Sequence, residues 1–124
     1  VFNAIENAWG GEIFVPKIPS YKITDVAMAI GPECKHVEVG IRPGEKLHEE
    51  MITSSDSFNT LDLGKYYVIL PQQPMFSLEE YKKHFNPKEV PLQFCYNSGT
   101  NDRWETVESI RQLVKKHIDP NFKA

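Results

Sequence analysis

The stretch GIRPGEKLHEEM, residues 40–51, constrains the fold more than any other part of this chain. Before the turn, residues 37–41 alternate between apolar and other side chains, which predicts a β-strand with one apolar face. The Arg-Pro-Gly-Glu sequence at residues 42–45 then ends the strand, because proline and glycine are strong local breakers of regular structure. Residues 46–51 are helix-prone, so we expect a helix to begin at the glutamate. The chain therefore needs a fixed turn between a strand and a helix here.

The residues before this turn predict a strand, a helix and a second strand. Residues 12–16 are a short, mostly apolar stretch that ends on proline, and Thr24 stands where it can cap a helix over residues 25–30. A Gly-Pro pair ends that helix, and the alternating residues 37–41 follow. This order predicts a βαβ unit with parallel strands and a right-handed crossover.

The other expected elements are short. They are a helix over residues 1–9, a hairpin of strands 60–63 and 67–70 around Gly64, a helix over 78–85, a strand over 92–96 and a helix from 107 to 118. Ser77 and Glu80 form a capping box, whereas the box at Thr106 looks incomplete because Ser109 stands where Glu or Gln is usual. We expect one small mixed α/β domain over residues 1–124, with the parallel βαβ unit, further short strands and a C-terminal helix.

Composition excludes several classes of protein. A formal net charge of −3 argues against a nucleic-acid surface, which needs a clustered basic face. No apolar run approaches the ~20 residues of a membrane span, and no secretory leader opens the chain. Cys34 and Cys95 lie far apart, so we expect reduced thiols and a cytoplasmic protein.

The first residues indicate a helix that is already under way. Val1, Ile5, Ala8 and Trp9 have helical spacing and a Gly-Gly stop follows, but no capping residue or initiator methionine precedes them. We therefore expect the chain to be a fragment of a longer polypeptide.

The Arg-Pro-Gly-Glu turn carries the best candidate binding residues. The Arg42 guanidinium is a planar fork of donors that matches phosphate oxygens, and a carboxylate such as Glu45 accepts from paired hydroxyl groups, as on a ribose. The pair is therefore suited to a nucleotide. The alternative is a surface Arg42–Glu45 ion pair that caps a helix, and the four residues alone favour that simpler interpretation.

Lys17 is a third candidate. The carboxyl ends of parallel strands meet at one edge of a sheet, so the loop after residue 16 and the Arg42 turn should be neighbours. A solvent-exposed loop lysine explains Lys17 equally well.

Two segments together carry a family resemblance. GGEIFVPKIPSYKITDVA (residues 10–27) followed by GIRPGEKLHEEMI (40–52) resembles the C-terminal part of the inverting UDP-N-acetylglucosamine 4,6-dehydratases, and YNSGTNDRW (96–104) matches more loosely. These extended short-chain dehydrogenase/reductase (SDR) enzymes open the pseudaminic acid pathway of bacterial surface glycans. Membrane-anchored retaining relatives have a similar GGEIFV, so the stereochemical outcome stays open.

The resemblance implies roles for named residues. Arg42 would contact the diphosphate of a UDP-sugar and Glu45 the ribose hydroxyls, which agrees with the interpretation from the residues themselves. The family also uses NADP, bound by a Rossmann domain, and homo-oligomers are expected. The seven glycines here include no Gly-x-x-Gly spacing, and no tyrosine has a lysine four residues later. We therefore expect this chain to be the substrate-binding part alone, inactive and without catalytic residues.

Three other features of the sequence allow alternative interpretations. His48, Glu45 and Glu49 invite a metal site, but Ile52 occupies the second histidine position of a His-Glu-x-x-His motif, and a solvated helix face explains the three residues. The loop over residues 97–104 reaches either a substrate or a neighbouring subunit, or is simply a turn. From a different class, the chain could be a stand-alone interaction module that docks a partner through the apolar faces of its first and last helices.

Overall fold

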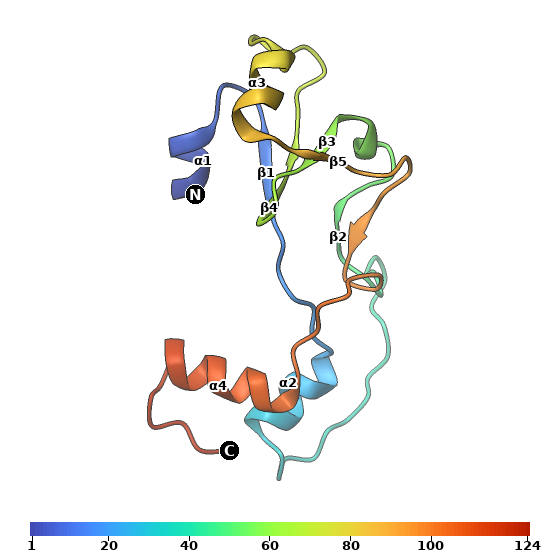
Figure 1. Ribbon diagram of the computed structural model, residues 1–124. Coiled ribbons are helices and arrows are strands. Elements are labelled where there is room, and N and C mark those ends of the chain that lie inside the picture. The colour runs from blue at the N-terminus through green and yellow to red at the C-terminus, as the bar shows by residue number, and fades with distance from the viewer. The chain divides into compact units, whose positions relative to one another are not determined.

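The computed structural model describes residues 1–124, and the chain divides into two compact units (Figure 1). The first unit consists of Val1–Ile18 and Glu50–Asn97, and the second of Pro19–Glu49 and Ser98–Ala124. Each unit thus combines an early and a late segment of the chain. None of the helices has both the length and the apolar character needed to cross a membrane.

Two antiparallel sheets lie in the first unit. The larger has the order β1-β4-β3-β5 and the smaller pairs β2 with β6. Their bounds are Ile13–Pro16 (β1), Glu50–Ile52 (β2), Thr60–Asp62 (β3), Tyr66–Ile69 (β4), Lys88–Glu89 (β5) and Tyr96–Asn97 (β6). The expected hairpin is confirmed: β3 pairs with β4 around Gly64, whose φ of +83° lies in the left-handed region that favours glycine. The expected strand over residues 92–96 is present only as β6.

The mixed α/β class is confirmed, but the parallel βαβ unit was wrong. β1 pairs antiparallel with β4, and residues 37–41 form no strand. The side chains of Val37, Val39 and Ile41 are 66%, 85% and 60% exposed. Alternation gives the period of a strand, but a strand also needs a neighbour for its backbone groups, and this segment has none.

The helix expected over residues 46–51 was also wrong. Residues 50–52 instead form β2, and Ile52 is completely buried. The intrinsic helix preference of Glu and Lys side chains is small, so the burial of one isoleucine in a sheet outweighs it.

The larger sheet has an apolar cluster on each face. Successive residues of a strand point to opposite faces. Val68 of β4 therefore joins one cluster, while its neighbours Tyr67 and Ile69 pack against the other. The buried members of the first cluster are Leu61, Val68, Leu70 and Tyr81, and those of the second are Val15, Ile52 and Tyr96. The sheet is thus covered by side chains on both sides.

Three helical segments accompany these sheets: α1 (Phe2–Asn7), the 3-10 helix η1 (Asp56–Asn59) and α3 (Leu78–Phe85). The capping box expected at the start of α3 is confirmed only in its Ser77 half, since the Ser77 hydroxyl accepts from the Glu80 N–H at 3.4 Å. Beyond the end of α1, the Trp9 ring packs edge-on against Phe76 and Tyr81, with ring centroids 5.6 and 5.3 Å apart. This aromatic contact ties the beginning of the chain to α3.

The second unit contains two helices that lie side by side, α2 (Ile23–Ile30) and α4 (Val107–His117) (Figure 1). The Arg111 guanidinium of α4 donates to the carbonyl oxygens of Met28 and Ala29, both at 3.2 Å. A cation at the C-terminus of a helix satisfies carbonyl groups that have no partner within the helix. Arg111 therefore joins the two helices and caps α2.

The N-terminal caps of α2 and α4 differ from the two expectations stated for them. Thr24 does not cap α2, which begins at Ile23, two residues earlier than expected, after Lys22. The capping box of α4 is complete: the Ser109 N–H donates to the Thr106 hydroxyl at 3.2 Å, and the Thr106 N–H donates to the Ser109 hydroxyl at 2.8 Å. A serine hydroxyl at the third position thus substitutes for the usual Glu or Gln.

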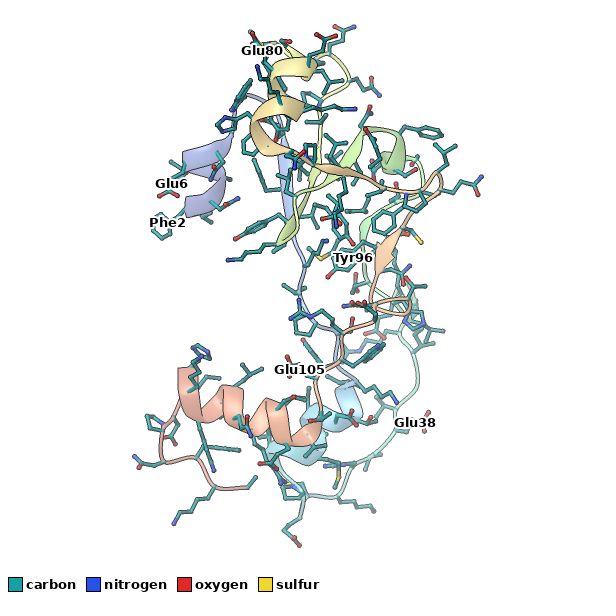
Figure 2. The ribbon with its side chains drawn as sticks, in the orientation of Figure 1. Phe2, Glu6, Glu38, Glu80, Tyr96 and Glu105 are labelled. Atoms are coloured by element: carbon teal, nitrogen blue, oxygen red, sulfur yellow. The ribbon has the colours of Figure 1, made fainter.

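We predict that Tyr81→Phe stabilises the first unit. The Tyr81 hydroxyl is buried without a hydrogen-bond partner, and such a group costs about 1–3 kcal/mol. We expect a rise of about 1 kcal/mol in the free energy of unfolding, measured by urea denaturation. The matched control is Tyr96→Phe, which should lower it, because the Tyr96 hydroxyl accepts from the Ile18 N–H at 2.9 Å and donates to the Ile18 carbonyl at 2.7 Å (Tyr96 is labelled in Figure 2).

Tyr81→Phe should also change how the free energy of unfolding depends on pH in the alkaline range. Burial, and secondarily the charge of Glu12, raises the pKa of Tyr81 from 10.0 to about 12. Tyr81 therefore ionises at a lower pH in the unfolded chain than in the folded one. The free energy of unfolding is unaffected by this ionisation below pH 10 and falls as the pH rises towards about 12. Tyr81→Phe should remove this part of the pH dependence. A stability of Tyr81→Phe below that of the native chain at neutral pH would contradict the prediction.

We predict that Thr53→Ala raises the pKa of Asp56 towards 3.8. The Thr53 hydroxyl and N–H donate to the Asp56 carboxylate at 2.6 and 3.0 Å, and these bonds, the hydroxyl first, lower the pKa of Asp56 below that value. The native chain therefore gains stability above pH 3.8 and loses it as the pH falls through the lowered pKa. An NMR titration of the Asp56 carboxyl carbon measures the shift, and an unchanged pKa would show that the hydroxyl is not its cause.

Candidate functional site

The Arg42–Glu45 turn is closed by two hydrogen bonds. The Glu45 N–H donates to the Arg42 carbonyl at 3.1 Å, and the Arg42 N–H donates to the Glu45 carboxylate (Oε2) at 2.8 Å. Pro43 and Gly44 occupy the two central positions, and the φ of Gly44 is +84°. Proline followed by a residue with positive φ is the sequence of a type II turn. The sequence thus fixes this turn locally.

The turn leaves its charged groups accessible. Arg42 and Glu45 are both exposed, and a Cβ at Gly44 would meet no atom within 4 Å. The glycine is therefore needed for its backbone angle and not for close packing. Since no helix follows, the helix-capping form of the alternative was wrong: the carboxylate caps the turn itself.

The chemistry of this turn suits a ligand with both phosphate and hydroxyl groups. The guanidinium offers five donors in a plane, and a hydrogen bond to a charged group contributes about 1.5–3 kcal/mol. One oxygen of the Glu45 carboxylate accepts a hydrogen bond from the Arg42 N–H. A carboxylate has about four lone-pair sites in all, so most of them are still available. It retains acceptor capacity for hydroxyl groups of a ligand.

A second pair of hydrogen bonds anchors the chain just after the turn. The Glu49 N–H donates to the Ser98 hydroxyl at 3.1 Å, and the Ser98 N–H donates to the Glu49 carbonyl at 2.8 Å. The turn segment therefore lies against the loop that begins at Ser98.

That loop is itself fixed by Ser20, a buried residue that the sequence did not single out. The Ser20 N–H donates to the Arg103 carbonyl at 2.8 Å, and the Ser20 carbonyl accepts from the Glu105 N–H at 2.7 Å. The Asn101 side chain donates to the Ser20 hydroxyl at 3.0 Å. These bonds are mostly made by the main chain, so the only sequence signal was the turn-rich composition of residues 97–104.

Lys17 lies in the first unit, whereas Arg42 and Glu45 lie in the second. Its ammonium group pairs with the Asp62 carboxylate at 2.6 Å and stands 4.3 Å from the centre of the Tyr67 ring. The parallel-edge argument for Lys17 fails, because β1 forms no parallel pair. A binding role for Lys17 stays a prediction, while its structural role is evident in these contacts.

The histidine and cysteine residues form no further constellation. His48, Glu45 and Glu49 do not share a helix face, and no group of three His, Cys, Asp or Glu residues is placed to hold a metal ion. Cys34 is an exposed free thiol and Cys95 is a half-buried one.

Comparison with known proteins gives a consistent result. A family model described as polysaccharide biosynthesis protein matches residues 1–71, more than half of the chain. UDP-N-acetylglucosamine 4,6-dehydratase (inverting) from Campylobacter jejuni is 39% identical over 120 residues, covering 92% of this chain and 35% of that protein. The resemblance expected from residues 10–27 and 40–52 is therefore confirmed.

Two further relatives extend the comparison. UDP-glucose 4-epimerase from Rickettsia canadensis is 35% identical over 121 residues, covering 92% of this chain and 34% of that protein. The crystal structure of Pen from Bacillus thuringiensis matches with a TM-score of 0.72 at 26% identity, covering 93% of this chain and 34% of the other. The chain thus spans about a third of the length of the relatives that it matches.

We predict that Lys17→Met destabilises the first unit. The substitution removes the ion-pair partner of Asp62, and both side chains of the pair are only 23% exposed. We expect a loss of about 1–2 kcal/mol in the free energy of unfolding, less than for a fully buried pair. The matched control is Lys82→Met, whose pair with Glu89 is 42% and 72% exposed and should contribute about 0–1 kcal/mol. Equal losses in the two variants would contradict a special role for Lys17.

Proposed function

We propose that this chain, which belongs to the polysaccharide biosynthesis protein family, is the sugar-nucleotide-binding portion of an inverting UDP-N-acetylglucosamine 4,6-dehydratase. The 39% identity to a dehydratase of that name over 92% of the chain supports the proposal. The similarity to a UDP-glucose 4-epimerase supports the broader part of it, because both names refer to a UDP-sugar. The substrate class is therefore a sugar linked to uridine diphosphate.

The single observation that carries the proposal is the closed Arg42–Glu45 turn. Arg42 would hold the diphosphate with its guanidinium, and Glu45 would accept from the ribose hydroxyls with the oxygen lone pairs that the turn leaves over. Both groups are exposed on a turn whose backbone is fixed by Pro43 and Gly44. Binding energy gathered on the nucleotide in this way positions the sugar for a reaction elsewhere.

The chemical step belongs to other parts of the enzyme in this proposal. NADP, which the family resemblance implies, does not fit the residues of this chain. The glycines lack the spacing of a dinucleotide-binding turn, and the larger sheet is antiparallel and not of the doubly wound parallel type. A cytoplasmic location, a role in the pseudaminic acid pathway and assembly into homo-oligomers are further parts of the proposal.

A second candidate is a stand-alone interaction module. One observation favours it: α1 exposes apolar side chains, with Phe2 81% and Ile5 74% exposed, and Figure 2 shows the Phe2 ring projecting from the helix. An apolar face of this kind is suited to a protein partner. This candidate requires no affinity for a nucleotide, so ligand titration separates the two.

We predict that the chain binds UDP weakly and saturably and that Arg42→Ala reduces the affinity about tenfold to a hundredfold, which corresponds to about 1.5–3 kcal/mol. Calorimetric titration measures both. The control is Lys115→Ala, which removes an exposed positive charge from the same unit and should leave the affinity unchanged. No saturable binding of UDP by the native chain, or equal affinities of the native chain and Arg42→Ala, would contradict the proposal.

A further inference from the structure

The imidazole of His48 lies directly against the main chain of Gly99. A Cβ atom placed on Gly99 would stand 2.8 Å from Cγ and Cδ2 of His48 and 2.9 Å from Nδ1. Carbon atoms in proteins do not approach so closely, so any side chain at residue 99 displaces the ring or the backbone. The φ of Gly99 is not in the left-handed region, so its conformation is open to other residues. The ring contact, and not the backbone angle, is what requires a glycine.

This contact lies next to the anchor of the turn segment. Glu49, which follows His48, exchanges two hydrogen bonds with Ser98, which precedes Gly99. The two chain segments therefore touch at two successive residues on each side, through the Glu49–Ser98 hydrogen bonds at one and through the His48 ring at the other.

The anchor is close to the candidate binding residues. Only Lys46 and Leu47 separate Glu45 from His48, and the Leu47 side chain is 84% exposed. The turn over residues 42–45 is closed by its own hydrogen bonds, which fix its internal geometry. Its position within the second unit then depends on where the chain is held at His48 and Glu49.

The other side of the contact is firmly held. The loop from Ser98 to Glu105 is bonded to the buried Ser20 through main-chain groups of residues 103 and 105 and through the Asn101 side chain. The loop is thus held in place by these hydrogen bonds, and the exposed turn segment packs against it.

We infer that Gly99 is a positioning residue of the Arg42–Glu45 site: the bare main chain at Gly99 seats the His48 ring, and the ring sets where the turn presents its guanidinium and carboxylate. The inference rests on the proposed function for its ligand, a nucleoside diphosphate. It assigns the loop after Ser98 to the binding site as a support, without any contact of its own with the ligand.

The experiment compares Gly99→Ala, His48→Ala and the double variant in UDP titrations of the full 124-residue chain. We expect Gly99→Ala to weaken binding about five- to tenfold, a part of the loss expected for removal of the guanidinium. In the His48→Ala background, the added methyl group meets no ring, so the same substitution should change the affinity less than about twofold. A merely structural effect of the methyl group would not depend on His48.

Amide resonances of Gly44 and Glu45 provide a second readout that needs no ligand. Gly99→Ala should shift both relative to the native chain, and the resonances of the double variant should match those of His48→Ala alone. Equal losses of affinity in both backgrounds, or unshifted Gly44 and Glu45 resonances, would overturn the inference. If the native chain does not bind UDP, the proposed function fails, and the resonance shifts alone decide whether Gly99 positions the turn.

Discussion

The first unit depends on strand β4, which pairs with β1 and β3 and contributes to both apolar clusters, since Val68 belongs to one and Tyr67 and Ile69 pack against the other. Val68 pairs with Phe14 of β1 and with Leu61 of β3, and its side chain is completely buried. This pairing also places Lys17. Because Pro16 pairs with Tyr66 while Tyr67 pairs with Asp62, the residue after β1 arrives beside the Asp62 carboxylate and the Tyr67 ring. The ion pair follows from the register of the sheet.

Local structure could be predicted from the sequence where one or two residues dictate it. Ser77 caps α3 because its hydroxyl reaches the third amide of the helix, and Gly64 turns the β3–β4 hairpin because its φ is positive. Pairing over long distances could not be predicted in the same way. The alternating residues 37–41 have the period of a strand, but alternation does not identify a partner, and the chain paired β1 with β4 instead.

In the candidate site, too, the local structure could be predicted from the sequence and the long-range contacts could not. The turn over residues 42–45 could be predicted, since Pro43 and Gly44 determine its backbone and Glu45 lies within reach of the Arg42 amide. Its support could not. Ser20 acts mainly through main-chain N–H and C=O groups, which every residue has. Gly99 acts through the absence of a side chain, and a glycine in a turn-rich loop is ordinarily explained by the turn itself.

A ligand that binds an exposed turn loses affinity if it has to immobilise mobile side chains and backbone of the turn. Immobilising a long side chain on binding costs about 0.5–1.5 kcal/mol, which is comparable with the gain from one charge-assisted hydrogen bond. Only the Arg42 side chain has to meet this cost, because the backbone of the turn and the Glu45 carboxylate are already held by hydrogen bonds. Rigidity within the turn is of use only if the turn as a whole is held in place. In the proposed site, the contact at His48 supplies that second requirement. Two small features far apart in the sequence, a Pro-Gly pair and a glycine facing a histidine, are then needed together for Arg42 to hold a nucleotide as we propose.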